Sequence, residues 1–147
     1  MGSERVGYTT GVYDLFHVGH LNLLTRAREQ CDRLIVGVTT DELALSVKGR
    51  RPTIPFEERA AIVKALRVVD EVVPQASMQK LDAWEKHRFD VVFVGDDHKG
   101  TRKWDEYEKA FADRGVAVVY FPYTLHTSST LLNQALNRLV QPAASEM

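Results

Sequence analysis

The stretch GVYDLFHVGH, residues 11–20, joins a strand pattern at residues 5–9 to a helical pattern. Apolar residues follow it at helical spacing: Leu23, Leu24, Ala27 and Cys31. His17 and His20 therefore lie at a predicted helix N-terminus, where exposed backbone N–H groups attract anions. Gly19 leaves room for a ligand close to the backbone. We predict an anion site here; incidental surface histidines or a metal pair are the alternatives.

Short β-branched runs recur outward from this stretch. They occupy residues 5–9, 33–39, 71–73, 91–94 and 116–121. Helical patterns separate or follow them: residues 56–66 and 78–86, Trp104 with Tyr107 and Phe111, and the leucine-rich residues 131–139. Nearly continuous apolar strands favour a parallel sheet covered on both faces. We predict an α/β fold, three-layered and Rossmann-like, with a five-stranded parallel sheet and ligands beyond its carboxyl edge.

Length and composition exclude several classes of protein. A chain of 147 residues with 44% hydrophobic and 27% charged residues is typical of one globular domain, predicted over residues 1–140 with a loose tail at 141–147. The net charge of −1 gives no general attraction to nucleic acid. The longest apolar run, residues 116–121, is too short to span a membrane. A single cysteine, Cys31, excludes an internal disulfide, and we expect a cytoplasmic protein.

GVYDLFHVGH resembles the signature of the cytidylyltransferases of the nucleotidyltransferase superfamily, with HxGH at residues 17–20. The segments TTDEL, FEER, VDEVVP and GDD extend the resemblance, which is strongest to the glycerol-3-phosphate cytidylyltransferases. It implies the nucleotidyltransferase fold, and transfer of CMP from CTP to a small phosphate acceptor with Mg²⁺ and release of pyrophosphate. It also implies a homodimer, and histidines, His17 and His20, that stabilise the transferring phosphoryl group.

Two cations complete the predicted catalytic set. Lys48 lies in a predicted flexible loop, residues 47–52, and the resemblance makes it the phosphate lysine; a solvated basic loop is the alternative. Arg59 falls inside the apolar arc of a helical wheel, so it requires an anionic partner. The resemblance suggests a triphosphate, whereas a structural carboxylate or a side chain reaching to solvent would also satisfy the arginine.

The nucleotide-binding prediction draws on three segments. Asp96 ends the fourth strand, where a carboxylate can accept hydrogen bonds from ribose or help to hold Mg²⁺, although Gly and Asp also build ordinary turns. The hydroxyl run before the last helix is an N-cap or a second phosphate cradle. The expected residues are Thr10, Gly11, Val12, Tyr13, Gly19, Asp96, Thr127, Ser128, Ser129 and Thr130.

The acceptor site departs from the family pattern. Tyr123 stands where these enzymes usually carry arginine, and His98 where they carry tryptophan. A cation from His98, Lys99, Arg102 or Lys103 can replace the missing charge, or all four belong to a solvated loop. Asp14 is predicted either to contact the acceptor or to orient the histidine loop through backbone N–H groups. The expected acceptor residues are Asp14, Asp97, His98, Lys99 and Tyr123.

Three further functions stay open at this point. A hydroxyalkylphosphonate carries nearly the same charged head group as a phosphate monoester, so a phosphonate cytidylyltransferase is one alternative. The motifs do not select the base, so an ATP-using adenylyltransferase is the second. A nucleotide-sensing protein, which would bind without turnover, is the third.

Overall fold

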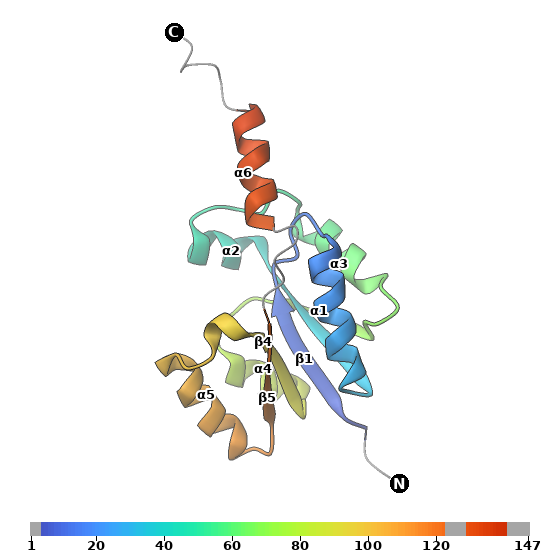
Figure 1. The fold of residues 1–147 in the computed structure, drawn as a ribbon, viewed down its shortest axis with the longest axis vertical. Helices are drawn as coiled ribbons and strands as arrows, with labels where there is room; N and C mark the ends of the chain where they lie inside the picture. The colour runs from blue at the N-terminus through green and yellow to red at the C-terminus, as the bar shows by residue number, and fades with distance from the viewer. Residues whose placement is uncertain (1–3, 123–128, 141–147) are drawn as a thin grey trace.

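The computed structural model describes residues 4–122 and 129–140. Its centre is a sheet of five strands, all parallel, in the order β3-β2-β1-β4-β5 (Figure 1). The strands are β1 (Val6–Gly11), β2 (Arg33–Thr39), β3 (Glu71–Gln75), β4 (Val91–Gly95) and β5 (Ala117–Phe121). The predicted α/β class and parallel sheet are therefore confirmed, with β3 two residues longer than its apolar run suggests.

Helices cover both faces of the sheet. α1 and α3 lie on one face and α4 and α5 on the other, while α6 extends away from the carboxyl edge (Figure 1). The helices are α1 (Val18–Glu29), α2 (Asp41–Lys48), α3 (Phe56–Lys64), α4 (Lys80–His87), α5 (Arg102–Ala112) and α6 (Ser129–Val140), with a 3-10 turn η1 (Asp96–His98). In the described ranges 4–122 and 129–140, no helix is long and apolar enough to cross a bilayer.

Each face of the sheet buries its own apolar cluster, because successive side chains of a strand point to opposite faces. Leu34, Val36 and Val38 of β2 pack with Leu24 of α1 and Val63 of α3. The opposite cluster joins strand residues to the aromatic side of α5: Tyr8, Ile35, Val92, Trp104, Tyr107 and Phe111. The two layers hold the carboxyl ends of β1, β2 and β4 in fixed positions, and the candidate site is built there.

Residues 47–52 are predicted as a loop, but the first two of them end a helix in the structure. Residues Asp41–Lys48 form α2, with the Thr40 hydroxyl accepting a hydrogen bond from Leu43 N at 3.1 Å as the N-cap. Gly49, at φ 79°, ends the helix in the left-handed conformation that glycine adopts without strain. Lys48 is therefore the last residue of a helix rather than part of a flexible loop.

Candidate functional site

A cavity of about 280 Å³ opens at the carboxyl edge of the sheet. Its walls come from the loop after β1, the first turn of α1, and the segment from the end of α2 to Pro52. Predicted residues meet there from separate parts of the chain: Thr10, Gly11, Val12, Tyr13, Asp14, Gly19, His20 and Lys48. This is the location that the parallel-sheet rule predicts for a ligand.

The two histidines cap α1 reciprocally. His17 is the N-cap residue, and its Nδ1 accepts a hydrogen bond from Gly19 N at 3.0 Å. Nδ1 of His20 accepts from His17 N at 3.2 Å, which places the two rings 4.1 Å apart between centroids. These are the contacts that Ser or Thr and Glu usually make in a capping box. HxGH therefore starts the helix and orients both imidazoles at once.

Both histidines are neutral at pH 7. Burial and, to a smaller extent, the nearby His17 lower the pKa of His20 to about 4, while Asp14 acts in the opposite direction. Burial also lowers the pKa of His17. A neutral imidazole that accepts at Nδ1 carries its proton on Nε2. The pair therefore supplies neutral N–H donors, which suit negative charge that develops during a reaction.

Three cations also line the cavity. Lys48 at the end of α2 is exposed and faces the cavity together with Arg50 and Arg51, whose role the sequence left open. Three cations and a helix N-terminus around one cavity favour a ligand with several negative charges. A nucleoside triphosphate meets that requirement.

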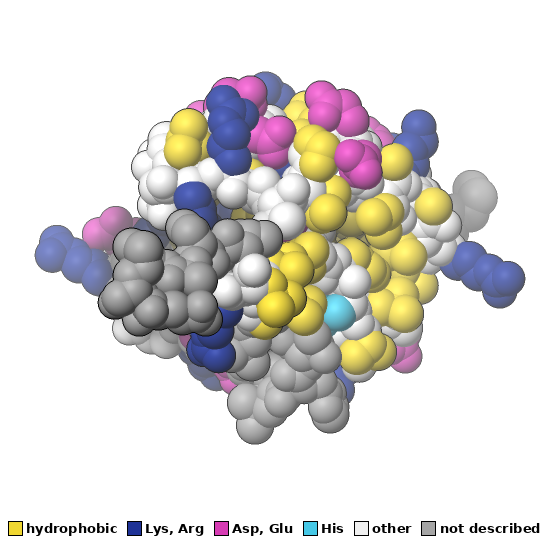
Figure 2. Space-filling model, turned by 90° about the horizontal axis from the view of Figure 1, so that it is seen from above, with side chains coloured by type: hydrophobic (Ala, Val, Ile, Leu, Met, Phe, Trp, Pro, Cys, Tyr) yellow, Lys and Arg dark blue, Asp and Glu magenta, His cyan; other side chains and the backbone are white. Residues whose placement is uncertain are grey.

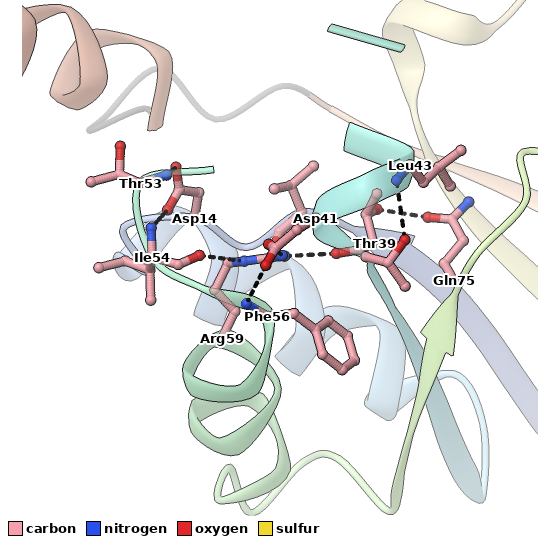
Figure 3. Close-up of polar contacts among 11 residues, drawn as sticks. Asp14, Thr39, Asp41, Leu43, Thr53, Ile54, Phe56, Arg59 and Gln75 are labelled. Atoms are coloured by element: carbon pink, nitrogen blue, oxygen red, sulfur yellow. Dashed lines mark hydrogen bonds and ion pairs between the residues drawn. The ribbon is translucent and has the colours of Figure 1, made fainter. Parts of the chain in front are cut away.

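Arg59 lies behind the cavity and not in its wall. Its guanidinium is buried and paired with Asp41, with Nη2 2.6 Å from Oδ1 (Figure 3). Nε donates to Ile54 O at 2.8 Å, and Nη1 donates to Val12 O at 2.6 Å and Thr39 O at 2.8 Å. The required anionic partner is therefore Asp41, where the resemblance suggested a triphosphate. Arg59 ties three cavity-forming segments together, which makes it a positioning residue.

Asp14 performs a related task. Its carboxylate accepts hydrogen bonds from Thr53 N at 2.8 Å and Ile54 N at 2.9 Å (Figure 3). Both backbone N–H groups belong to the segment before α3. The side chain is 5% exposed. Asp14 joins the loop after β1 to the segment that carries the arginines.

The remaining predicted residues divide into two groups. η1 places Asp96, Asp97 and His98 at the end of β4, and these residues and Lys99 are exposed. His98 lines a second cavity, smaller than the first. Ser129 and Thr130 are the first residues of α6, whereas Tyr123, Thr127 and Ser128 lie outside the described residues.

Sequence reasoning missed Lys80. This first residue of α4 reaches across the sheet edge, and its Nζ donates a hydrogen bond to Thr10 Oγ1 at 2.7 Å. Burial and, to a smaller extent, the nearby Lys103 lower the pKa of Lys80 to about 8. The sequence offered one indication of Lys80, its place shortly after a predicted strand. Residues that follow β3 lie at the same edge of a parallel sheet as residues that follow β1.

The edge of this parallel sheet combines a histidine-capped helix with a cation-lined cavity. These two features together define a class of proteins that bind nucleotide phosphates. The chain belongs to the cytidylyltransferase-like family, whose family model matches residues 8–142. Membership confirms the resemblance noted above and makes the protein a nucleotidyltransferase.

Known proteins of this kind align along most of the chain. Glycerol-3-phosphate cytidylyltransferase of Bacillus spizizenii is 37% identical over 132 residues, which cover 89% of this chain and 96% of the relative. FAD synthase of Pyrococcus abyssi is 31% identical over 142 residues, or 95% and 96% of the two chains. A crystal structure of the lipopolysaccharide core biosynthesis protein from Thermoplasma volcanium has a TM-score of 0.70 at 23% identity, covering 85% of this chain and all of that one, which shows a shared fold.

Proposed function

We propose that this protein transfers CMP from CTP to glycerol 3-phosphate and releases pyrophosphate. The observation that carries the proposal is the cavity that joins Gly19 and His20, in the first turn of α1, to Lys48, Arg50 and Arg51. The relative from Bacillus spizizenii, aligned over nearly its whole length, supports the choice of nucleotide and acceptor.

The reaction needs positioning and charge stabilisation more than a covalent nucleophile. An oxygen of the acceptor phosphate attacks the α-phosphorus of CTP, and the bond to the bridging oxygen breaks as pyrophosphate leaves. Negative charge spreads over the α-phosphate oxygens. The Nε2–H groups of His17 and His20 donate to this charge, while Lys48, Arg50 and Arg51 neutralise the triphosphate.

We propose that Mg²⁺ accompanies the nucleotide. Within residues 4–122 and 129–140, no group of three His, Cys, Asp or Glu side chains is placed to hold a metal. Mg²⁺ often takes one or two carboxylates and otherwise phosphate oxygens and water, so Asp96 or Asp97 at the end of β4 would be the carboxylate to hold it. The metal would supply further neutralisation of the phosphate charge when bound.

Pyrophosphate release tests the proposed function. The assay combines Mg²⁺ with CTP or ATP and with glycerol 3-phosphate or 2-hydroxyethylphosphonate. Turnover with CTP and glycerol 3-phosphate is expected. Preference for the phosphonate, or CTP binding without turnover as in a sensor, would contradict the proposal.

An adenylyltransferase is the second candidate. The alignment with FAD synthase over 142 residues favours it, because FAD, the product in that relative's name, contains adenine. The same assay separates the two, since faster pyrophosphate release with ATP than with CTP would establish the second candidate.

Replacing Lys48 with Met should lower kcat/KM for CTP by about 100-fold, by analogy with loss of one preorganised transition-state donor. The side chain is exposed, so thermal stability should not change. Lys64→Met, an exposed lysine at the end of α3 away from both cavities, is the matched control. Equal kinetics for the two variants would remove Lys48 from the site.

We also propose the homodimer that the resemblance implies. Exposed apolar side chains of α1 and α2 support it: Val18 is 51% and Val47 54% exposed, with Leu21 and Leu45 beside them in sequence. Figure 2 shows hydrophobic side chains gathered over one side of the face at the carboxyl edge, around a histidine. Sedimentation equilibrium tests the dimer, and a monomer at every concentration would contradict it. The cytoplasmic location stays a prediction.

A further inference from the structure

The loop between β1 and α1 places two aromatic side chains against one of the two histidines. The ring of Tyr13 meets that of His20 edge-on, with 5.5 Å between centroids and an interplanar angle of 68°. The ring of Phe16 lies 5.1 Å from the same imidazole, tilted by 31°. With His17 at 4.1 Å, three rings pack against His20. We call Tyr13 and Phe16 the aromatic enclosure of this histidine.

The backbone of the loop has an uncommon conformation around Tyr13. Tyr13 and Leu15 have φ values of 55° and 51°, in the left-handed region that residues with a Cβ seldom occupy. A Cβ on Gly11 would come within 2.8 Å of the Tyr13 ring, so the ring lies directly on the glycine backbone. Backbone strain of this kind persists only where the surrounding contacts hold it, and it gathers at functional sites.

Tyr13 connects the core of the protein to the first cavity. Its side chain is 6% exposed and packs in the apolar cluster that contains Leu24 of α1 and Val36 of β2. Tyr13 also lines the cavity together with His20. Phe16 is half-buried against the same cluster. Because the enclosure borders the cavity, loss of either ring would leave a space that water can enter beside the imidazole.

We propose that Tyr13 is a positioning residue for the transfer reaction, and that with Phe16 it holds the imidazole of His20 in the orientation that both caps α1 and donates to phosphate. The inference rests on the proposed function and explains how the second histidine is kept in place. In this orientation Nδ1 accepts from His17 N at 3.2 Å, which leaves Nε2 to carry the proton. A protonated imidazole cannot accept at Nδ1, so the enclosure and the cap favour the same neutral form.

Replacing Tyr13 with Ala should make His20 titrate at a higher pH. Burial lowers the pKa of His20 to about 4 in the natural protein. Besides Tyr13 itself, His17 and Asp14 are the titratable groups that act on it, and His17 disfavours the charged form while Asp14 favours it. Without the ring, the midpoint should rise by at least about one pH unit, toward the ordinary value of about 6.5.

NMR titration of the imidazole Hε1 signals measures this midpoint. The protein has five histidines, so the signal of His20 is identified by its absence from the His20→Gln variant. The titration needs no turnover. A raised midpoint in a protein that releases no pyrophosphate would support the enclosure and contradict the proposed function.

Turnover provides the second measurement. At pH 7, kcat for CTP and glycerol 3-phosphate should fall by about 10-fold in Tyr13→Ala, because a displaced donor no longer meets the developing charge. Tyr13→Phe keeps the ring, so both kcat and the His20 midpoint should stay close to those of the natural protein. Neither replacement is glycine, so both retain the strained φ and the comparison reports the ring alone.

Phe89→Ala is the matched control. Phe89 is 1% exposed, but it packs in the cluster on the opposite face of the sheet and is not among the residues that line either cavity. This variant should lose stability without a change in the His20 midpoint. If Tyr13→Ala does not fold, Phe16→Ala removes the half-buried part of the enclosure and should raise the midpoint as well. An unchanged midpoint in the folded enclosure variants, or an equal rise in Phe89→Ala, would overturn the assignment.

Discussion

Replacing His17 with Ser and His20 with Gln together should lower kcat by at least about 100-fold while the protein keeps its fold. The serine and glutamine of this double variant form an ordinary capping box, S-x-x-Q, so the helix start that the two imidazoles build would be preserved. The reaction loses both Nε2–H donors, since neither replacement side chain has the length and direction of imidazole. Single-turnover pyrophosphate release at saturating CTP measures the loss.

The control for this experiment is His17→Ala. Removing the N-cap without replacement should cost about 1 kcal/mol of unfolding free energy, measured in urea, in addition to the loss of kcat. The double variant should unfold at nearly the urea concentration of the natural protein. If the double variant keeps its kcat, then the histidines only cap α1 and the catalytic assignment is wrong.

Replacing Arg59 with Met should lower the free energy of unfolding by about 3 kcal/mol or more. The guanidinium is fully buried, and its removal leaves Asp41 and the carbonyl oxygens of Val12, Thr39 and Ile54 without their donor. Because these groups come from three separate segments, the loop after β1 and the segment before α3 should be held less firmly, with the hydrogen bonds of Asp14 left to join them. Urea unfolding gives the loss of stability, and the KM for CTP reports the loosened cavity.

An exposed arginine provides the comparison. Arg102 pairs with Glu106 at 3.6 Å, but its side chain is 94% exposed, so Arg102→Met should change stability by less than about 0.5 kcal/mol. A loss below about 1 kcal/mol for Arg59→Met would contradict the positioning role. Retained stability with a large rise in the KM for CTP would instead favour the phosphate partner that the resemblance suggested.

The local pattern of the sequence predicted the fold of this protein and the place of its site. Apolar runs located the five strands, and the glycine and histidines of residues 11–20 located the anion site, because strand pairing, helix starts and turns depend on neighbouring residues. The missed helix α2 shows where local pattern is weak. It has only eight residues, so its pattern spans little more than two turns, and its start is marked by the Thr40 cap and the acidic first turn.

The partners of the charged residues could be identified only from the tertiary structure. Arg59 was predicted to need an anion, but Asp41 lies 18 residues away, and only the packing of α3 against the end of β2 brings the two together. Lys80 and Thr10 are 70 residues apart, and no local pattern relates them. A helix or strand signal extends over a few residues, whereas an ion pair or hydrogen bond between distant segments depends on where the whole sheet places their ends. The sequence by itself therefore determined the sheet, its ligand edge and the histidine motif, while the tertiary structure decided which cations line the cavities and which hold the walls in place.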